Sequence, residues 1–141
     1  MKPPTIGLGM IVHPQDTHLL SPFLARHQAS FDAVSIVLDA EVETVSASAL
    51  IRSRFQAAPH RLRLAERVLG RDFATQRNFC ASLNPCDWLL MLDMDERLHV
   101  RMLQLLKPVL AMVLSKTPET RVIGFARRNV IDGRATEVWP D

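Results

Sequence analysis

The stretch DWLLMLDMDE, residues 87–96, is a short apolar run that ends abruptly in carboxylates. An apolar run of this length between polar residues predicts a strand that is buried on both faces of a sheet. Because successive side chains of an extended chain alternate between faces, we expect Asp93 and Asp95 to point the same way and Met94 the opposite way. Two carboxylates on one side suit a hard cation, Mg²⁺ or Mn²⁺, that keeps water and phosphate among its ligands. The stretch therefore predicts a site for a metal-bound diphosphate where this strand ends.

The same carboxylates also have a simpler interpretation. Asp and Glu favour helix N-termini, so the cluster could cap the next helix along the chain. An isolated Asp-x-Asp is also a weak motif. Glu96 falls on the opposite face from Asp93 and Asp95 if the strand persists, so we interpret it as an outer support of the site or as a helix cap.

The bulk composition is that of one globular domain. Of the 141 residues 48% are hydrophobic and 23% are charged, and the net charge is only +2. So small a charge argues against a strong general attraction to nucleic acid or to an anionic bilayer. Cys80 and Cys86 lack the spacing of a zinc knuckle and predict reduced thiols in a cytoplasmic protein. The apolar run 6–12 is too short, and too interrupted by glycine, for a signal peptide or a membrane span.

Segments of strand and helix type alternate along the chain, which is the β-α-β pattern of a parallel sheet. Strands are expected at 6–12, at 33–38 with Asp39 at the tip, at 62–68 as a short edge strand, at the 87–96 stretch and at 122–126. Helices are expected from near Asp16 or Ser21 to Phe31, within 41–55, over 72–83 with Asp72 near the cap, and after Glu96. Asp132-Gly133 predicts a hairpin turn leading toward 138–139. Gly7 and Gly9 lie inside the first strand, where they favour close backbone packing and not a dinucleotide fingerprint.

Three further groups of residues are assigned structural roles. The helix after Glu96 is expected to bury its apolar residues, which are Leu98, Met102, Leu105, Leu106, Val109, Leu110 and Val113. Six arginines gather around the edge strand: Arg52, Arg54, Arg61, Arg63, Arg67 and Arg71. Without aromatic residues for base stacking, they are interpreted as a solvated face, although an approach to membrane lipid phosphates is also compatible. The five histidines have no metal-ligand spacing and predict surface or helix-packing roles.

Two motifs together resemble a known family. DFATQRNF at 72–79, with DWLLMLDMDE at 87–96 after it, resembles the nucleotide-sugar half of family 2 glycosyltransferases with the GT-A fold. In that family a Phe-Ala-x-x-Arg-Asn helix precedes a strand that ends in Asp-x-Asp, at about this separation. The segments 127–133 and 139–141 resemble those found after the Asp-x-Asp motif in bacterial members. The resemblance covers most of the chain from Ile6. It implies an α/β, Rossmann-like GT-A domain over residues 1–141, with a mostly parallel central sheet, helices on both faces and a C-terminal part missing.

The resemblance also implies roles for individual residues. Asp39 would recognise the nucleoside, Arg77 would lie near the base and diphosphate, and Asp93 would contact the ribose and the metal. Asp95 would be the more direct ligand of the Mn²⁺ or Mg²⁺ ion. The turn after Asp39, AEVE at 40–43, departs from the Gly-Ser-x-Asp type common in the family. The general base of inverting members lies further along the chain than Asp141, so no catalytic residue is identified here.

The expected function is therefore inverting transfer of a sugar from a nucleoside diphosphate to an unknown acceptor, in the cytoplasm and without nucleic acid. The oligomeric state is left open. One alternative is a non-catalytic nucleotide-binding or assembly module. Another is a haloacid-dehalogenase-like phosphatase, which also places Asp-x-Asp after an apolar strand. That family usually puts this strand first and needs a downstream lysine and a further acidic pair, which the last segment lacks.

Overall fold

The computed structural model describes residues 2–125, 129–131 and 134–136. Its contacts divide the chain into two compact units, residues 1–111 and 112–141. The larger unit contains the main sheet and the smaller one contains a two-stranded hairpin. That residues 1–141 form one domain stays a prediction.

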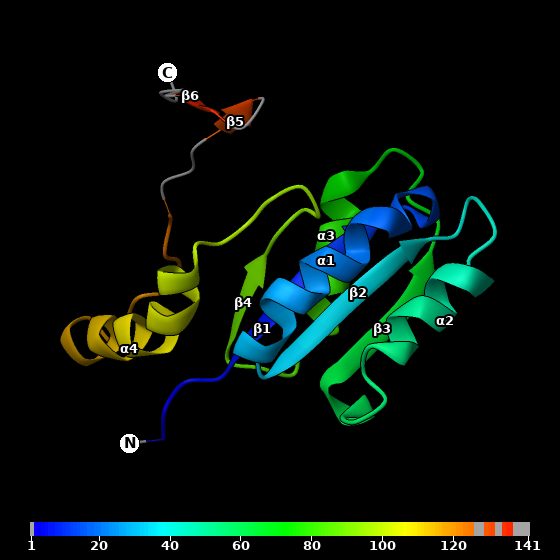
Figure 1. Cartoon of the computed structure of the whole chain (residues 1–141). Helices are drawn as coiled ribbons and strands as arrows, with labels where there is room; N and C mark the ends of the chain where they lie inside the picture. Colours follow the sequence, from blue (N-terminus) through cyan, green and yellow to red (C-terminus); the bar gives the residue numbers. More distant parts are fainter. Residues whose placement is uncertain (1, 126–128, 132–133, 137–141) are drawn as a thin grey trace. The chain divides into compact units, whose positions relative to one another are not determined.

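The larger unit is built on four parallel strands (Figure 1). They are β1 (Ile6–Val12), β2 (Ala33–Asp39), β3 (Leu62–Arg67) and β4 (Trp88–Met91), and their order across the sheet is β3-β2-β1-β4. In register, Gly7 of β1 lies opposite Ala33 of β2 and opposite Leu89 of β4, while Asp39 lies opposite Arg67 of β3. This order is consistent with a Rossmann-like fold, in which the strand order reverses between the first and fourth strands.

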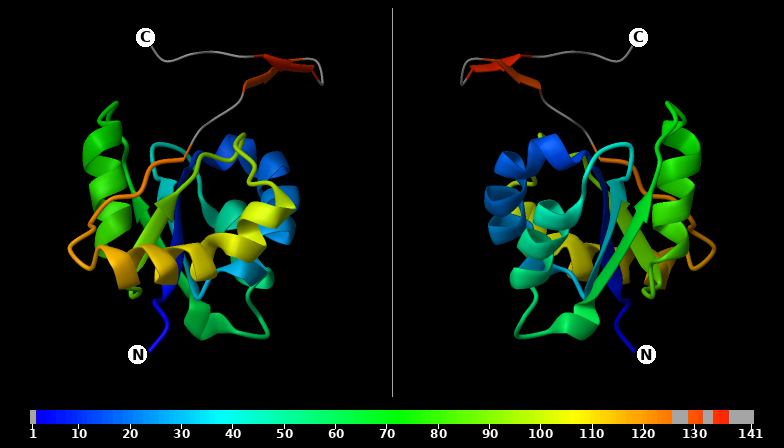
Figure 2. Two further views of the ribbon diagram at one scale, coloured as in Figure 1. Left: turned by 90° about the vertical axis from the view of Figure 1, so that its left-hand side faces the viewer. Right: turned by 90° about the vertical axis from the view of Figure 1, so that its right-hand side faces the viewer.

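Helices cover both faces of this sheet, as predicted. Helix α1 (Thr17–His27) connects β1 to β2 and helix α2 (Val45–Ser53) connects β2 to β3. Helix α3 (Phe73–Ser82) returns the chain from β3 to β4 and packs on β1 and β2 from the other face (Figure 2). Short 3-10 helices flank these elements at Pro14–Asp16, Gln28–Ser30 and Pro59–Arg61. Two helices on one face and one on the other result from right-handed crossovers that run first toward β3 and then back to β4.

The core lies around the two central strands. All seven residues of β2 are buried, as are all residues of β1 except Ile11. Side chains approach the backbone of β1 closely at its two glycines, because a Cβ atom on Gly9 would lie 2.7 Å from Met91 Sδ, and one on Gly7 would overlap the Asn84 side chain. The close packing predicted for these two glycines is confirmed.

Two predictions for the apolar segments need correction. Strand β4 is not buried on both faces: Trp88, Leu89, Leu90 and Met91 are all half-buried, because β4 pairs with β1 on one side and with no described strand on the other. Helix α4 (Val100–Lys116) is present, but among its predicted core residues only Leu106 and Leu110 are buried, whereas Leu105 is 50% exposed. Further apolar residues of α4, among them Val100 and Met112, lie outside the predicted stripe and are exposed too. The apolar surface of α4 is therefore wider than one packed face covers.

The smaller unit differs from the prediction in one segment. Residues 122–125 form no strand, so the strand expected at 122–126 is wrong over its described part. A run of β-prone residues becomes a strand only where a partner supplies hydrogen bonds, and no described strand pairs with it. Strands β5 (Asn129–Ile131) and β6 (Arg134–Thr136) pair antiparallel with Ile131 opposite Arg134. The predicted turn at Asp132-Gly133 and the segment 138–139 lie outside the described residues.

Candidate functional site

A cavity of about 310 Å³ opens at the carboxyl ends of the parallel strands. Its lining comes from the β1–α1 region (Ile11, His13, Asp16, Leu19), the tip of β2 (Asp39), the β3–α3 region (Leu69, Phe73, Arg77) and the turn after β4 (Asp93, Met94, Asp95). Open α/β sheets bind ligands at this edge, in the crevice where the strand order reverses. The cavity thus brings together all four residues that the resemblance assigned to donor and metal, although they are spread from position 39 to position 95.

Asp39 is held rigidly at the tip of β2. Its side chain is almost fully buried, and its Oδ1 accepts hydrogen bonds from the backbone N–H groups of Glu41 (3.1 Å) and Leu69 (3.0 Å). The other oxygen, Oδ2, accepts no hydrogen bond from any described residue. A carboxylate oriented by two donors on one oxygen presents its second oxygen to a ligand that donates from a hydroxyl or an N–H group.

The unusual turn after Asp39 has a structural role. Glu41 Oε1 accepts a hydrogen bond from the N–H of Gly70 (3.0 Å), next to the Asp39–Leu69 contact. These carboxylates hold a connection in which Gly70 (φ 58°) and Arg71 (φ 62°) both adopt left-handed conformations. A left-handed non-glycine residue costs roughly 1–2 kcal/mol, so such a connection needs contacts that fix it. Glu41 therefore stabilises the wall of the cavity that contains Leu69.

Arg77 reaches the cavity from helix α3. Hydrogen bonds in the first turns of this helix fix its position. Asp72 caps the helix by accepting hydrogen bonds from Thr75 N (3.0 Å) and Thr75 Oγ1 (2.6 Å), and these bonds lower the pKa of Asp72. The buried Gln76 side chain donates to Arg67 O (2.8 Å) and accepts from Arg67 Nη1 (2.9 Å). The cap predicted at Asp72 is confirmed, and α3 is tied to the end of β3 one residue before Arg77.

Asp93 and Asp95 lie in a turn and not in a strand. The prediction that strand alternation orients them is therefore wrong. Strand β4 ends at Met91, and Asp93 O accepts a hydrogen bond from Glu96 N (3.0 Å) while Glu96 Oε2 accepts one from Asp93 N (2.8 Å). Asp93, Met94 and Asp95 all line the cavity, so strand alternation does not describe this segment. Glu96 closes the turn and does not cap α4, which begins at Val100.

The two carboxylates of this turn have different partners. Asp93 contacts Arg77, with Arg77 Nη2 lying 3.3 Å from Oδ1 and 3.4 Å from Oδ2. Asp95 forms no hydrogen bond or ion pair with any described residue. No group of three His, Cys, Asp or Glu side chains suited to a metal ion occurs among the described residues. Two carboxylates at an open cavity nevertheless fit the donor set of Mg²⁺ or Mn²⁺, which take one or two carboxylates and complete their coordination with phosphate oxygens and water.

Behind the acidic turn, the chain is anchored to helix α1 through one residue. Arg26 donates to Leu98 O from Nε (3.0 Å) and Nη2 (2.8 Å), and the buried His27 accepts from Leu98 N at Nε2 (3.1 Å). His27 Nδ1 then donates to Phe23 O (2.9 Å), because its other nitrogen is an acceptor. Burial lowers the pKa of His27, an effect that the positive charges of Arg26 and Arg97 reinforce. The helix-packing role predicted for this histidine is confirmed.

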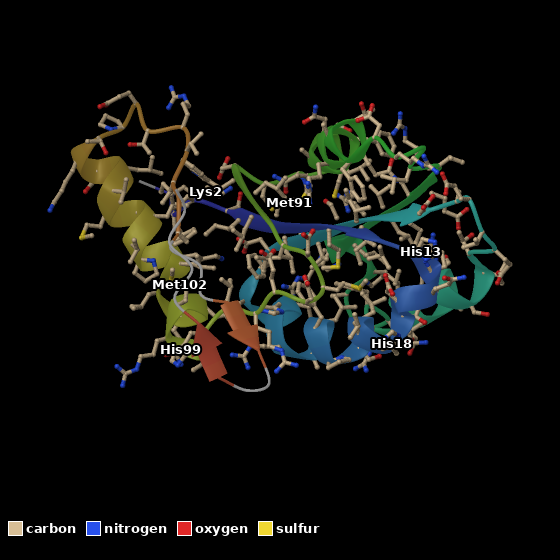
Figure 3. The ribbon with its side chains drawn as sticks, turned by 90° about the horizontal axis from the view of Figure 1, so that it is seen from above. Lys2, His13, His18, Met91, His99 and Met102 are labelled. Atoms are coloured by element: carbon tan, nitrogen blue, oxygen red, sulfur yellow. The ribbon has the colours of Figure 1, made fainter. Side chains whose placement is uncertain are left out.

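Most of the other lining residues were not singled out as site residues from the sequence, among them His13, Asp16 and Phe73. His13 comes directly after β1 and caps the first turn by accepting a hydrogen bond from Gln15 N at Nδ1 (3.2 Å). Asp16 and the 54% exposed Phe73 lie at the starts of α1 and α3. In the sequence, these residues come directly after an expected strand or at the start of an expected helix, and this position could have indicated that they line the site. Figure 3 shows His99 well away from His13 and His18, so these histidines do not gather into one site.

The arginine cluster is partly structural. Arg61 donates to the backbone oxygens of Gln28, Phe31 and Asp32, and Arg63 donates to His60 O (2.7 Å). Arg67 lies over the Phe79 ring at 5.6 Å in addition to its contacts with Gln76. The interpretation as a simple solvated face is therefore incomplete. None of the helices in the described part combines the length and the apolar character needed to cross a bilayer.

Comparison with known protein families finds no family model that matches the chain. Comparison with curated proteins finds no significant match either. The functional conclusion therefore depends on the residues of the cavity and on the physical chemistry of their arrangement.

Proposed function

We propose that this chain binds a nucleoside diphosphate sugar and is the donor-binding part of a GT-A glycosyltransferase of family 2, which performs inverting transfer to an acceptor. One observation carries the proposal: Asp39, Arg77, Asp93 and Asp95 line the same cavity at the strand ends. Asp39, Asp93 and Asp95 lie at or just after the ends of parallel strands, so the sheet brings them to one edge. Arg77 reaches the same opening from α3, and this combination of side chains supports the proposal.

The lining of the cavity combines two kinds of side chain. Ile11, Leu19, Leu69 and Phe73 supply apolar surface, whereas Arg77, Asp93 and Asp95 supply charge. A ligand that joins a planar base and ribose to phosphates matches this combination. With such a ligand bound, Asp39 Oδ2 accepts a hydrogen bond from the nucleoside, and the guanidinium of Arg77 binds phosphate oxygens.

Sugar transfer breaks the bond between the anomeric carbon and a phosphate oxygen, so negative charge grows on the leaving diphosphate. A divalent cation supplies Lewis-acid stabilisation of that charge when bound. Asp95 and Asp93 would hold the cation, and Arg77 would add a second positive charge on the same phosphates. No residue of the cavity is assigned as the base that deprotonates the acceptor.

A thermal-shift panel tests the proposal. UDP, GDP, ADP, CDP and dTDP are each added with and without Mn²⁺, and at least one of them is expected to raise the melting temperature in a Mn²⁺-dependent manner. A ligand present at 100 times its dissociation constant stabilises the folded state by about 2.7 kcal/mol. If no nucleoside diphosphate shifts the melting temperature in the presence of Mn²⁺, the proposal is wrong.

A matched pair of variants locates the binding. Asp95→Asn removes one charge at the carboxyl end of β4, and Asp87→Asn removes the same charge at the amino end, where Asp87 accepts hydrogen bonds from Thr5. By calorimetry Asp95→Asn is expected to lose Mn²⁺-dependent nucleotide binding, while Asp87→Asn retains it. Equal affinity in Asp95→Asn and the wild type would refute the metal assignment.

A non-catalytic nucleotide-binding module remains the principal alternative, because no described residue has the role of general base. Slow hydrolysis of a nucleotide sugar by the chain would favour the enzyme. Binding of a protein partner with no nucleotide affinity would favour an assembly module. The phosphatase alternative gains no support, since that chemistry needs a lysine and no lysine is among the cavity-lining residues of the described chain.

A further inference from the structure

The ion pair between Arg77 and Asp93 occupies the two residues that the proposed ligand needs most. Each would contact a different part of the complex, the diphosphate for Arg77 and the cation for Asp93, yet here they contact each other. Their side chains are 46% and 52% exposed, so both are open to solvent at the cavity. While this contact persists, neither side chain is available to its proposed ligand.

The geometry of the pair is that of a weak, replaceable contact. A single nitrogen, Arg77 Nη2, lies between both carboxylate oxygens at 3.3 and 3.4 Å. A strong charge-assisted bond is shorter, at about 2.7–2.9 Å, and a bidentate pair uses two nitrogens. Exposed ion pairs of this kind contribute little to stability because water screens them. Arg77 and Asp93 can exchange this contact for better partners at small cost.

The backbone at both ends of the pair is fixed, so an exchange needs only side-chain movement. Asp93 lies in the turn closed by its two hydrogen bonds with Glu96. Arg77 comes after Gln76, which is buried and bonded to Arg67, and α3 is capped by Asp72. Both side chains can therefore rotate while their attachment points stay in place.

We infer that the Arg77–Asp93 pair is an interlock that makes the cavity take a diphosphate and a divalent cation together. While Arg77 neutralises Asp93, the pair of carboxylates lacks the charge to hold a cation, and Arg77 is not free for phosphate. A diphosphate that draws Arg77 into a two-nitrogen contact releases Asp93, which then joins Asp95 as an oxygen ligand. The inference rests on the proposed function and adds an order of binding to it. The cation binds stably only together with the diphosphate, and not before it.

If the interlock exists, removing Arg77 changes the binding of the cation to Asp93, and removing Asp93 changes the binding of phosphate to Arg77. Arg77→Gln frees Asp93 and is expected to tighten binding of Mn²⁺ alone by about two- to fivefold, the range of an exposed ion pair. Asp93→Asn frees Arg77 and is expected to tighten metal-free binding of inorganic pyrophosphate by a similar factor. Both effects are expected to disappear when the partner is already substituted, which is the signature of direct coupling in a double-mutant cycle.

Two controls separate the pair from general electrostatics. Arg97→Gln removes a positive charge two residues from Asp95, and Arg97 has no ion pair among the described residues. Asp16→Asn removes a negative charge from the same cavity without touching the pair. Free Mn²⁺ is measured by electron paramagnetic resonance and pyrophosphate binding by calorimetry. The inference expects smaller changes in Arg97→Gln and Asp16→Asn than in Arg77→Gln and Asp93→Asn.

The outcomes distinguish the interlock from the proposed function. If nucleoside diphosphates stabilise the wild type with Mn²⁺, but Arg77→Gln changes Mn²⁺ affinity equally in the presence and absence of Asp93, the interlock is wrong and the proposed function stands. If no nucleoside diphosphate binds the wild type, both fall. Coupling that vanishes in the Asp93→Asn background, together with nucleotide binding by the wild type, supports both.

Discussion

The ends of β2 and β4 face the same cavity but present their carboxylates in opposite ways. Asp39 at the end of β2 is 2% exposed and fixed by two backbone donors, whereas Asp93 and Asp95 lie on an exposed turn after β4. One strand ends in the buried middle of the sheet and the other at its described edge. The carboxylate of Asp39 is thus oriented before a ligand arrives, whereas those of Asp93 and Asp95 can still move.

The difference suggests a division of labour. A fixed acceptor loses little entropy on binding and discriminates between ligands by where their donors lie. A mobile pair can change partners, which suits residues that must respond to a cation and a diphosphate. The comparison therefore separates recognition at β2 from metal and phosphate binding at β4, and substitutions at the two ends should affect folding and binding differently.

The largest expected effect on folding is at the β2 end. Asp39→Ala leaves the N–H groups of Glu41 and Leu69 without their acceptor and is expected to lower the free energy of unfolding by about 2–3 kcal/mol. Urea denaturation monitored by circular dichroism measures it. Asp39→Asn keeps an oxygen that can accept both bonds, so it should retain most of the stability while weakening nucleotide binding. A loss below about 0.5 kcal/mol in Asp39→Ala would remove the distinction between the two ends.

The second largest effect on folding is expected from acid, which acts on His27, the residue that holds Leu98 behind the acidic turn. Because the pKa of His27 is lowered by burial in the folded state, the unfolded chain takes up the proton first as the pH falls below about 6.5. Stability is therefore present above about pH 6.5 and is lost as the pH falls from there toward the lower pKa of the folded state. Protonation also removes the acceptor for Leu98 N, which lies just behind the acidic turn.

Denaturation between pH 5 and pH 7.5 checks this expectation, in a range well above the ordinary titration of the carboxylates. His27→Gln should be less stable at neutral pH but should show a flatter pH dependence than the wild type. His18→Gln, an exposed position in the same helix, should keep the wild-type slope. The same slope in His27→Gln as in the wild type would mean that another group senses the pH.

The smallest expected effect on folding is at the tip of the β4 end. Asp95→Ala removes a side chain without a partner in the described structure, so the free energy of unfolding should change by less than about 0.5 kcal/mol. Thermal denaturation without ligand measures it. A change above about 1 kcal/mol would show that Asp95 supports the turn and is not held ready for a ligand.

The sequence predicted the central part of the fold well because that part obeys local rules. Strand β1 has the predicted limits, β2 extends the prediction only by Asp39, and Asp72 caps α3 as expected. Apolar runs bounded by polar residues, and side chains that accept at a helix start, act over a few residues and can be seen in the chain. The meeting of Asp39, Arg77, Asp93 and Asp95 was predicted from the resemblance and from the rule that strand ends share an edge.

The predictions that failed depended on neighbours that the chain does not show locally. Leu105 and Val109 have the spacing of core residues, but their exposure depends on which side of α4 is packed. The side chains of Asp93 and Asp95 are placed by a turn closed by Glu96, and a glutamate three residues later is not a specific signal of such a turn. The roles of Arg61 and Glu41 required contacts with residues about 30 positions away.

In the proposed complex, Asp95 holds a divalent cation that binds a nucleoside diphosphate in this cavity. A crystal of the chain grown with Mn²⁺ and the nucleoside diphosphate that most raises the melting temperature tests it most directly, by anomalous scattering from the manganese. We expect one anomalous peak within bonding distance of the Asp95 carboxylate and of the diphosphate, with Arg77 turned from Asp93 to the phosphate. A nucleotide bound in the cavity with no peak at Asp95, or bound elsewhere on the protein, would contradict it.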